Sequence, residues 1–251
     1  MMELSDWLLI GGGTFAGIIN TISGSGTLFS LGVMALMDIP LVTANIATRP
    51  GVFFQNITGI YVLRKYRQFT KNDIKLWPIV YTGIGAMLGA VCAGIVSGHF
   101  FNLIASAVML LLLLQYLLPL KFLNFTTPLS DKSKHTFHYA LFFAAGFYGG
   151  FIQIGIGILI LTILFRYLAM PYASANAYKL IIITIYTLPT TLYFALTDKI
   201  LWKPALLLAL GQIIGAYLAA VFISVKTNAR SWAKWITVLM IVITLLKIWA
   251  F

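Results

Sequence analysis

The sequence predicts an all-α protein that crosses a membrane several times and consists of two related halves of opposite orientation. Of its 251 residues, 61% are hydrophobic and 9% are charged, whereas a soluble domain carries roughly 25% charged residues. Glycine, proline and asparagine residues recur in one order in both halves, and the loops alternate in basic content. We therefore predict an inverted-topology repeat, in which each half has a glycine-broken pair of short helices and three spanning helices.

Apolar stretches fill almost the whole chain and leave no room for a soluble domain. Six of them reach the ~20 residues that a tilted spanning helix needs. The stretches are 7–22, 27–38, 44–63, 78–97, 100–119, 137–154, 158–168, 173–195, 204–224 and 232–250. We divide the chain into a first repeat at 1–120, a cytoplasmic connecting loop at 121–136 and a second repeat at 137–251.

The two halves share residues that are rarely interchangeable, which indicates an internal duplication. A shift of 131 positions pairs Gly24 with Gly155, Gly26 with Gly157, Pro40 with Pro171, Ala44 with Ala175 and Asn45 with Asn176. A shift of 126 positions then pairs Pro78 with Pro204, Gly85 with Gly211 and Gly89 with Gly215. The small-xxx-small glycine pairs permit close helix contact, inside one chain or in a homodimer, and we favour contact inside the chain.

Loop charge predicts the orientation of each half. The loops at 64–75, 121–135 and 225–234 are basic, whereas the turn near Gly98 and the loop at 198–203 carry little charge. Since cytoplasmic loops gather lysine and arginine, equivalent loops of the two halves fall on opposite sides of the membrane. We expect an inverted repeat in a multi-pass plasma-membrane protein, with the acidic N-terminal end outside.

Each half contains a short helix pair interrupted by glycine, SGSG at 23–26 and GIG at 155–157. Paired interruptions of this kind point to the central site of a transporter, because non-helical backbone at membrane depth needs a cavity or buried surroundings. The alternative is a kink or close packing in a purely structural bundle. If the breaks form a transporter site, the second helix of each pair points its N-terminus towards the membrane interior, which favours an anionic ligand.

Neutral polar side chains lie close to both breaks and add hydrogen-bond donors. They are Asn20, Ser23, Ser25 and Thr27 in the first half and Gln153 in the second. The alternative for the hydroxyl residues is ordinary bonding to their own helix backbone.

The third segment of each half opens with an alanine-asparagine pair followed by a cation. Asn45 and Asn176 are expected to cap these helices. Arg49 and Lys179 follow within one turn, where an ionisable residue in an apolar helix suggests function. The alternative is that both side chains reach out to the membrane interface.

Several functions are disfavoured by residues that the chain lacks. The only glutamate is Glu3, and the aspartates lie at segment ends or in loops, which argues against a cation carrier and a buried carboxylate relay. The histidines have no acidic or cysteine partners in sequence, so we expect no metal. We also expect no cofactor, no nucleic-acid partner and no enzyme activity, because the basic residues are scattered and no nucleophile or phosphate loop is evident.

The sequence resembles the sulfite exporter TauE/SafE family of bacterial and archaeal membrane proteins over nearly its whole length. The resemblance rests on GTFAGIINTISGSGTLFSLGVMALMDIPLVTANIATRPG and GFYGGFIQIGIGILILTILFRYLAMPYASANAYKL. It implies export of sulfite or small organosulfonates across the bacterial plasma membrane. Thr48 stands where many relatives have a second asparagine, and Gln153 replaces a small residue, which leaves the particular anion open.

We therefore predict a secondary transporter of a small anion that works by alternating access. An anion channel and a membrane scaffold or assembly factor remain alternatives. The predicted substrate-binding residues lie at the breaks and at the starts of the third segments: Asn20, Ser23, Gly24, Ser25, Gly26, Thr27, Asn45, Arg49, Gln153, Gly155, Gly157, Asn176 and Lys179.

Overall fold

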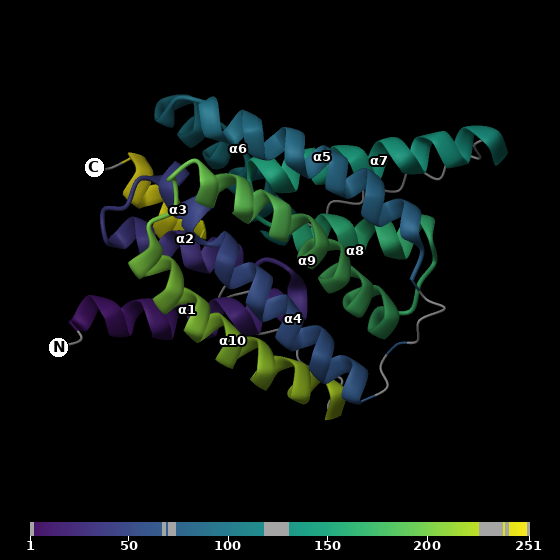
Figure 1. The fold of residues 1–251 in the computed structure, drawn as a ribbon, viewed down its shortest axis with the longest axis horizontal. Helices are drawn as coiled ribbons and strands as arrows, with labels where there is room; N and C mark the ends of the chain where they lie inside the picture. Colours follow the sequence, from purple (N-terminus) through teal and green to yellow (C-terminus); the bar gives the residue numbers. More distant parts are fainter. Residues whose placement is uncertain are drawn as a thin grey trace.

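The computed structural model describes residues 3–66, 69, 74–117, 131–225, 238 and 241–249. These residues form helices and connecting turns, with no strand among them (Figure 1). The helices are α1 Leu4–Ser23, α2 Thr27–Leu36, α3 Leu41–Ala47, α4 Arg49–Lys65, α5 Leu76–Ile95, α6 Gly98–Leu117, α7 Asp131–Phe151, α8 Ile156–Tyr167, α9 Tyr172–Leu196 and α10 Trp202–Val225, followed by helical residues 241–249.

Glycine breaks separate α1 from α2 and α7 from α8, as predicted, but the first helix of each pair is not short, with 20 residues in α1 and 21 in α7. Helix α1 ends at Gly24, whose φ is 83°, and α8 begins after Gly155, whose φ is 67°. Glycine adopts this left-handed conformation without strain, so it allows the chain to leave one helix and begin another. The α1–α2 pair lies towards the end of the molecule that carries the N-terminus, and α7–α8 lies towards the other end (Figure 1).

The third segments begin earlier than predicted. Pro40 and Pro171 occupy the N-cap positions of α3 and α9, so Asn45 and Asn176 lie inside these helices. The prediction that the asparagines cap the helices is therefore wrong, because proline already sets an extended backbone in front of each helix. Much of the predicted connecting loop at 121–136 lies outside the described residues, and α7 begins at Asp131, so the division into 1–120, 121–136 and 137–251 stays a prediction.

Glycines bring two pairs of helices into backbone contact. A Cβ atom on Gly85 or Gly89 of α5 would lie 2.1 or 2.0 Å from the carbonyl oxygens of Phe143 and Phe147 in α7. Gly211 and Gly215 of α10 meet α1 in the same way, at the carbonyl oxygens of Ile10 and Thr14. The prediction that these glycines pack inside one chain is confirmed.

The long helices expose apolar faces. Three described helices are both long and apolar enough to span a membrane: Leu76–Ile95, Tyr172–Leu196 and Trp202–Ser224. Leu88, Leu192 and Leu210 on these helices are 50 to 54% exposed, and similar leucines surround them. Large exposed apolar faces on spanning-length helices are stable against lipid hydrocarbon and not against water.

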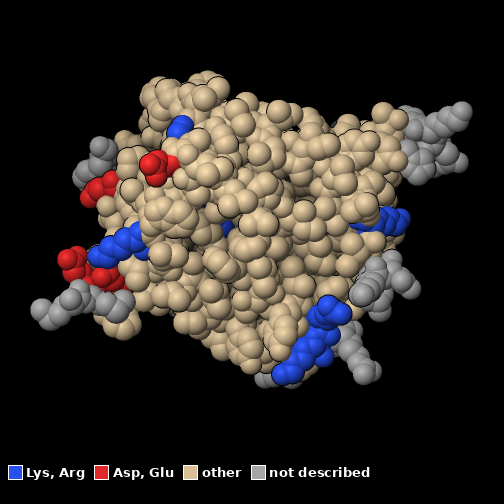
Figure 2. Space-filling model, in the orientation of Figure 1, with Lys and Arg blue, Asp and Glu red and all other residues tan. Residues whose placement is uncertain are grey.

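Charged side chains lie at the ends of the molecule. On the face drawn in Figure 2, acidic side chains gather at the end that carries the N-terminus, and the opposite end shows basic ones. Two ion pairs, Lys203 with Asp6 at 3.0 Å and Lys247 with Asp38 at 2.8 Å, stabilise the acidic end. Most of the basic loops at 121–135 and 225–234 lie outside the described residues, so the orientation across the membrane stays a prediction.

The glycine contact of α5 with α7 predicts that Gly89→Ala destabilises the protein. Its Cβ would meet the backbone oxygen of Phe147 at 2.0 Å, and a backbone atom cannot move aside alone. We expect a loss of about 1–3 kcal/mol, as for overpacked cores, measured as a lower melting temperature in detergent. Gly83→Ala on the same helix is the control, because nothing lies within 4 Å of its Cβ. Equal melting temperatures for the two variants would contradict the contact.

Candidate functional site

The two glycine breaks contact each other. A Cβ atom on Gly24 would lie 2.5 Å from Cα of Gly157, and one on Gly157 would lie 2.4 Å from Cα of Gly24. Side chains larger than hydrogen would separate these segments, which explains the need for glycine at both positions. The two predicted breaks, 131 residues apart in register, therefore meet in space.

Lys179 of α9 lies beside the end of α1. The side chain is fully buried, so the alternative of reaching out to the interface does not apply. Its Nζ donates to Oδ1 of Asn176 at 2.8 Å and to the carbonyl oxygens of Asn20 at 3.1 Å and Thr21 at 3.5 Å. These carbonyls belong to the last turn of α1, where the negative end of the helix dipole stabilises a cation.

Arg49 of α4 occupies an equivalent place beside the end of α7. It is also fully buried. Its Nη1 donates to Oγ1 of Thr190 at 3.2 Å, its Nη2 donates to the carbonyl oxygen of Gly150, and its guanidinium carbon lies 4.9 Å from the ring centre of Phe194. Each half therefore supplies a cation to the first helix of the other half.

Neither buried cation forms an ion pair with a described carboxylate. The ion pairs of the described residues join Lys203 to Asp6 and Lys247 to Asp38, near helix ends. A charge inside a membrane protein is costly unless it is paired, and carbonyl oxygens compensate it only in part. The interior therefore carries positive charge that suits an anionic ligand.

The cations form two separate centres. On α9, the first centre consists of Lys179 and its partner Asn176. The second centre, around Arg49, contacts α9 at Thr190 and Phe194. The span from Lys179 to Thr190 corresponds to ~16 Å of helix rise. One centre therefore lies at the end of α1 and the other at the end of α7.

Asn45 joins the first half to the second break. Its Nδ2 donates to the carbonyl oxygen of Phe151 at 3.1 Å, and its Oδ1 accepts from the backbone N–H of Gln153 at 3.1 Å. The hydroxyl of Thr48 donates to the Asn45 carbonyl at 2.9 Å and lies 3.5 Å from Oε1 of Gln153. Asn45 therefore holds the non-helical segment in place.

The predicted polar residues of the first break have mixed roles. The Ser23 hydroxyl donates to the carbonyl oxygen of Ile19 at 2.9 Å, which is the bond to its own helix backbone that we gave as the alternative. It also lies 2.8 Å from the Ser25 hydroxyl. Gly26 packs against α1, since its Cβ would lie 2.0 Å from the carbonyl oxygen of Ala16. The remaining first-break residues, Asn20, Ser25 and Thr27, are buried.

Buried polar atoms without a hydrogen-bond partner surround the two centres. Among the predicted site residues they are Nε of Arg49, Nε2 of Gln153 and Nδ2 of Asn176, all of them N–H donors. Sequence reasoning missed Gln55 and Asn56 of α4, whose amides also lack partners. Their signal was visible as two adjacent amides inside the apolar stretch 44–63.

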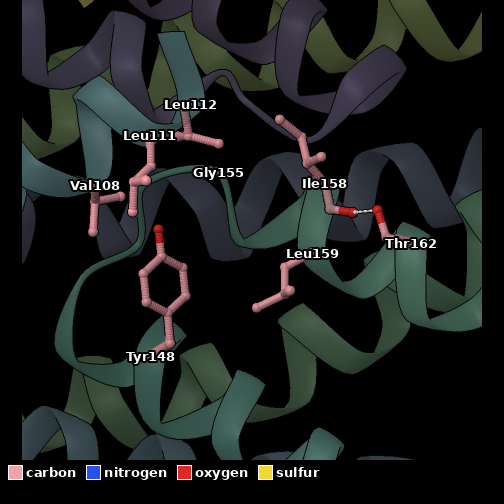
Figure 3. Close-up of a pocket in the computed structure, with 8 residues that line it drawn as sticks. All are labelled: Val108, Leu111, Leu112, Tyr148, Gly155, Ile158, Leu159 and Thr162. Atoms are coloured by element: carbon pink, nitrogen blue, oxygen red, sulfur yellow. Dashed lines mark hydrogen bonds between the residues drawn. The ribbon is translucent and has the colours of Figure 1, made fainter. Parts of the chain in front are cut away.

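A cavity of about 340 Å³ lies beside the second break but does not suit an anion (Figure 3). Its lining is mostly aliphatic, from α6, α7, α8 and Gly155. The hydroxyls of Tyr148 and Thr162 already donate to the carbonyl oxygens of Ile154 and Ile158. The chemistry for an anion lies instead at the buried cations.

The fold and the buried site define a multi-pass α-helical membrane protein with a positively charged interior. A family comparison agrees: the model of the sulfite exporter TauE/SafE family matches residues 9–248. The chain belongs to this family, whose membership implies a membrane transporter of sulfite or related anions. No curated protein and no solved structure matches the chain.

The Asn45 contacts predict that Asn45→Leu destabilises the protein. The change leaves the Phe151 carbonyl and the Gln153 N–H without partners, at a cost of about 1–3 kcal/mol for each unpaired group. Asn45→Asp keeps the acceptor for Gln153 and should lie between Asn45→Leu and the unmodified chain in melting temperature. A melting temperature of Asn45→Leu equal to that of the unmodified chain would show that Asn45 does not hold the break.

Proposed function

We propose that this protein is a secondary transporter that exports a small oxyanion, sulfite or an organosulfonate, across the bacterial plasma membrane. The observation that carries the proposal is the pair of fully buried cations, Arg49 and Lys179, without a described carboxylate partner. A tetrahedral or pyramidal oxyanion presents several acceptor oxygens, which match guanidinium and ammonium donors.

Neutral donors support the same ligand class. Among the described residues, Asn176, which accepts from Lys179, has an unpaired N–H group, and so does Gln153, which lies 3.5 Å from the hydroxyl of Thr48, the neighbour of Arg49. Helices α2 and α8 both begin at the contact between the breaks, and a helix N-terminus favours negative charge. We propose that the anion binds near the contact between the two breaks, with the predicted site residues around it.

The reciprocal contacts of the two halves support alternating access by an inverted repeat. Helix α1 packs on α10 and α7 packs on α5, so the first helix of each half lies against the other half. Each buried cation likewise contacts the first helix of the other half. Rocking of one half against the other would break one centre while the other stays closed.

The charge distribution supports one orientation. Arg64 and Lys65 lie in the last turn of α4 and Lys75 precedes α5, and both helix ends lie away from the end of the molecule that carries the N-terminus (Figure 1). By the positive-inside rule the basic end faces the cytoplasm, which puts the N-terminus outside.

The test is flux into liposomes that contain the purified full chain. We expect saturable sulfite uptake, and counterflow when the liposomes are preloaded with sulfite, which a channel does not show. Arg49→Gln and Lys179→Gln should each reduce flux at least about tenfold, because losing a charge-assisted hydrogen bond costs about 1.5–3 kcal/mol.

Lys65→Gln is the matched control, because Lys65 is exposed at the end of α4 and should transport normally. Normal flux in both buried-cation variants would move the site elsewhere. No flux of any oxyanion in the unmodified chain would reject the transporter proposal.

A further inference from the structure

Two adjacent side chains in the middle of α4 have unpaired amides. Gln55 and Asn56 are each 1% exposed, and both polar atoms of each amide lack a hydrogen-bond partner among the described residues. Buried amides are normally satisfied, because an unpaired buried polar group destabilises the fold. Two neighbours with this property indicate a place where a polar ligand binds.

The two amides lie between the cation centres. Helices α4 and α9 run antiparallel, because Arg49 contacts Thr190 whereas Gly59, later in α4, faces Leu180, earlier in α9. Asn56 is two turns beyond Arg49 and shares its face towards α9. In the same register Asn56 lies opposite the part of α9 around Ile183.

Gln55 faces the neighbouring helix α10. It lies one turn from Gly51, and a Cβ on Gly51 would lie 2.0 Å from Oε1 of Gln212. Nε2 of Gln212 donates to the Ser30 hydroxyl at 2.8 Å, while its Oε1 is unpaired. Unpaired acceptors therefore accompany unpaired donors along this part of α4.

The mixture of donors and acceptors restricts the ligand. An amide has an N–H group that donates and an oxygen that can only accept. A fully deprotonated oxyanion or a halide has acceptors alone, so it would leave the amide oxygens unpaired. A ligand with acceptor oxygens and its own O–H or N–H group pairs with both parts of each amide.

We propose that Gln55 and Asn56 form a neutral site on the route between the two buried cations, where they select oxyanions that carry their own hydrogen-bond donor. Hydrogensulfite and hydroxyalkanesulfonates belong to this class. The inference rests on the proposed function and adds a specificity-determining pair to it.

The ionisable groups around this site are few. Arg49 lies on α4 itself, and α9 contributes Lys179 and Tyr186. The Tyr186 hydroxyl points towards α7, because a Cβ atom on Gly149 of α7 would lie 2.8 Å from it. The described parts of α1 and α10 that pack on α4 present no ionisable side chain to it. The ligand and these few protein groups are therefore the two sources of pH dependence that the experiment distinguishes.

The experiment compares matched ligands in liposomes that contain the full chain. One comparison is sulfite uptake at a pH where hydrogensulfite predominates against a pH where the dianion predominates. The other is 2-hydroxyethanesulfonate against ethanesulfonate, which differ by one hydroxyl donor and carry the same single negative charge over that pH range. We expect the unmodified chain to favour the donor-bearing ligand in both pairs by about tenfold.

The variants Gln55→Met and Asn56→Leu keep side-chain volume and remove the amides. We expect both to lose the tenfold preference and to melt no lower than the unmodified chain, since each removes unpaired polar atoms. Thr58→Val is the control on the same helix, because its hydroxyl bonds only to the Phe54 carbonyl, and it should keep the preference.

Two results would overturn the inference. One is an unchanged preference in both amide variants while Arg49→Gln abolishes flux, which rejects the selecting role and keeps the transporter. The other is an equal pH dependence for sulfite and ethanesulfonate, which assigns the titration to a protein group and not to the ligand. Lack of flux for every oxyanion would instead reject the proposed function itself.

Discussion

Buried positive charge is the constraint on which the rest of this structure depends. Arg49 and Lys179 are fully enclosed in a helical bundle that offers them no described carboxylate. Each is stabilised by carbonyl oxygens at the end of a helix that precedes a glycine break, α7 for Arg49 and α1 for Lys179. The glycine breaks make this possible, because a helix that stops at depth leaves its last carbonyls free to accept from a cation.

The same arrangement ties the two halves together. Each cation comes from one half and contacts the first helix of the other, and Asn45 repeats this pattern at the second break. Close backbone contacts through glycine hold α1 against α10 and α5 against α7. A movement of one half against the other would therefore act on contacts that these cations make.

The glycine breaks and the presence of cations in apolar stretches were predictable from sequence, because each uses a residue type with one strong physical preference, whereas the burial of Arg49 and Lys179 was one of two alternatives. Glycine at positive φ ends a helix, and a cation in an apolar stretch needs a partner. Helix starts were predicted less well, since Pro40 and Pro171 begin α3 and α9 ahead of the asparagines that were expected to cap them. The amides of Gln55 and Asn56 were overlooked because neutral residues carry no comparable preference in sequence.

The sequence by itself determined the class of protein and the places where glycine interrupts a helix. These properties follow from composition, local backbone preference and order along the chain. Only the tertiary structure decided that Gly24 meets Gly157, that the cations form two centres and that each is held by the opposite half. The reason is that contacts between residues more than a hundred positions apart depend on how the helices pack, which no local pattern specifies.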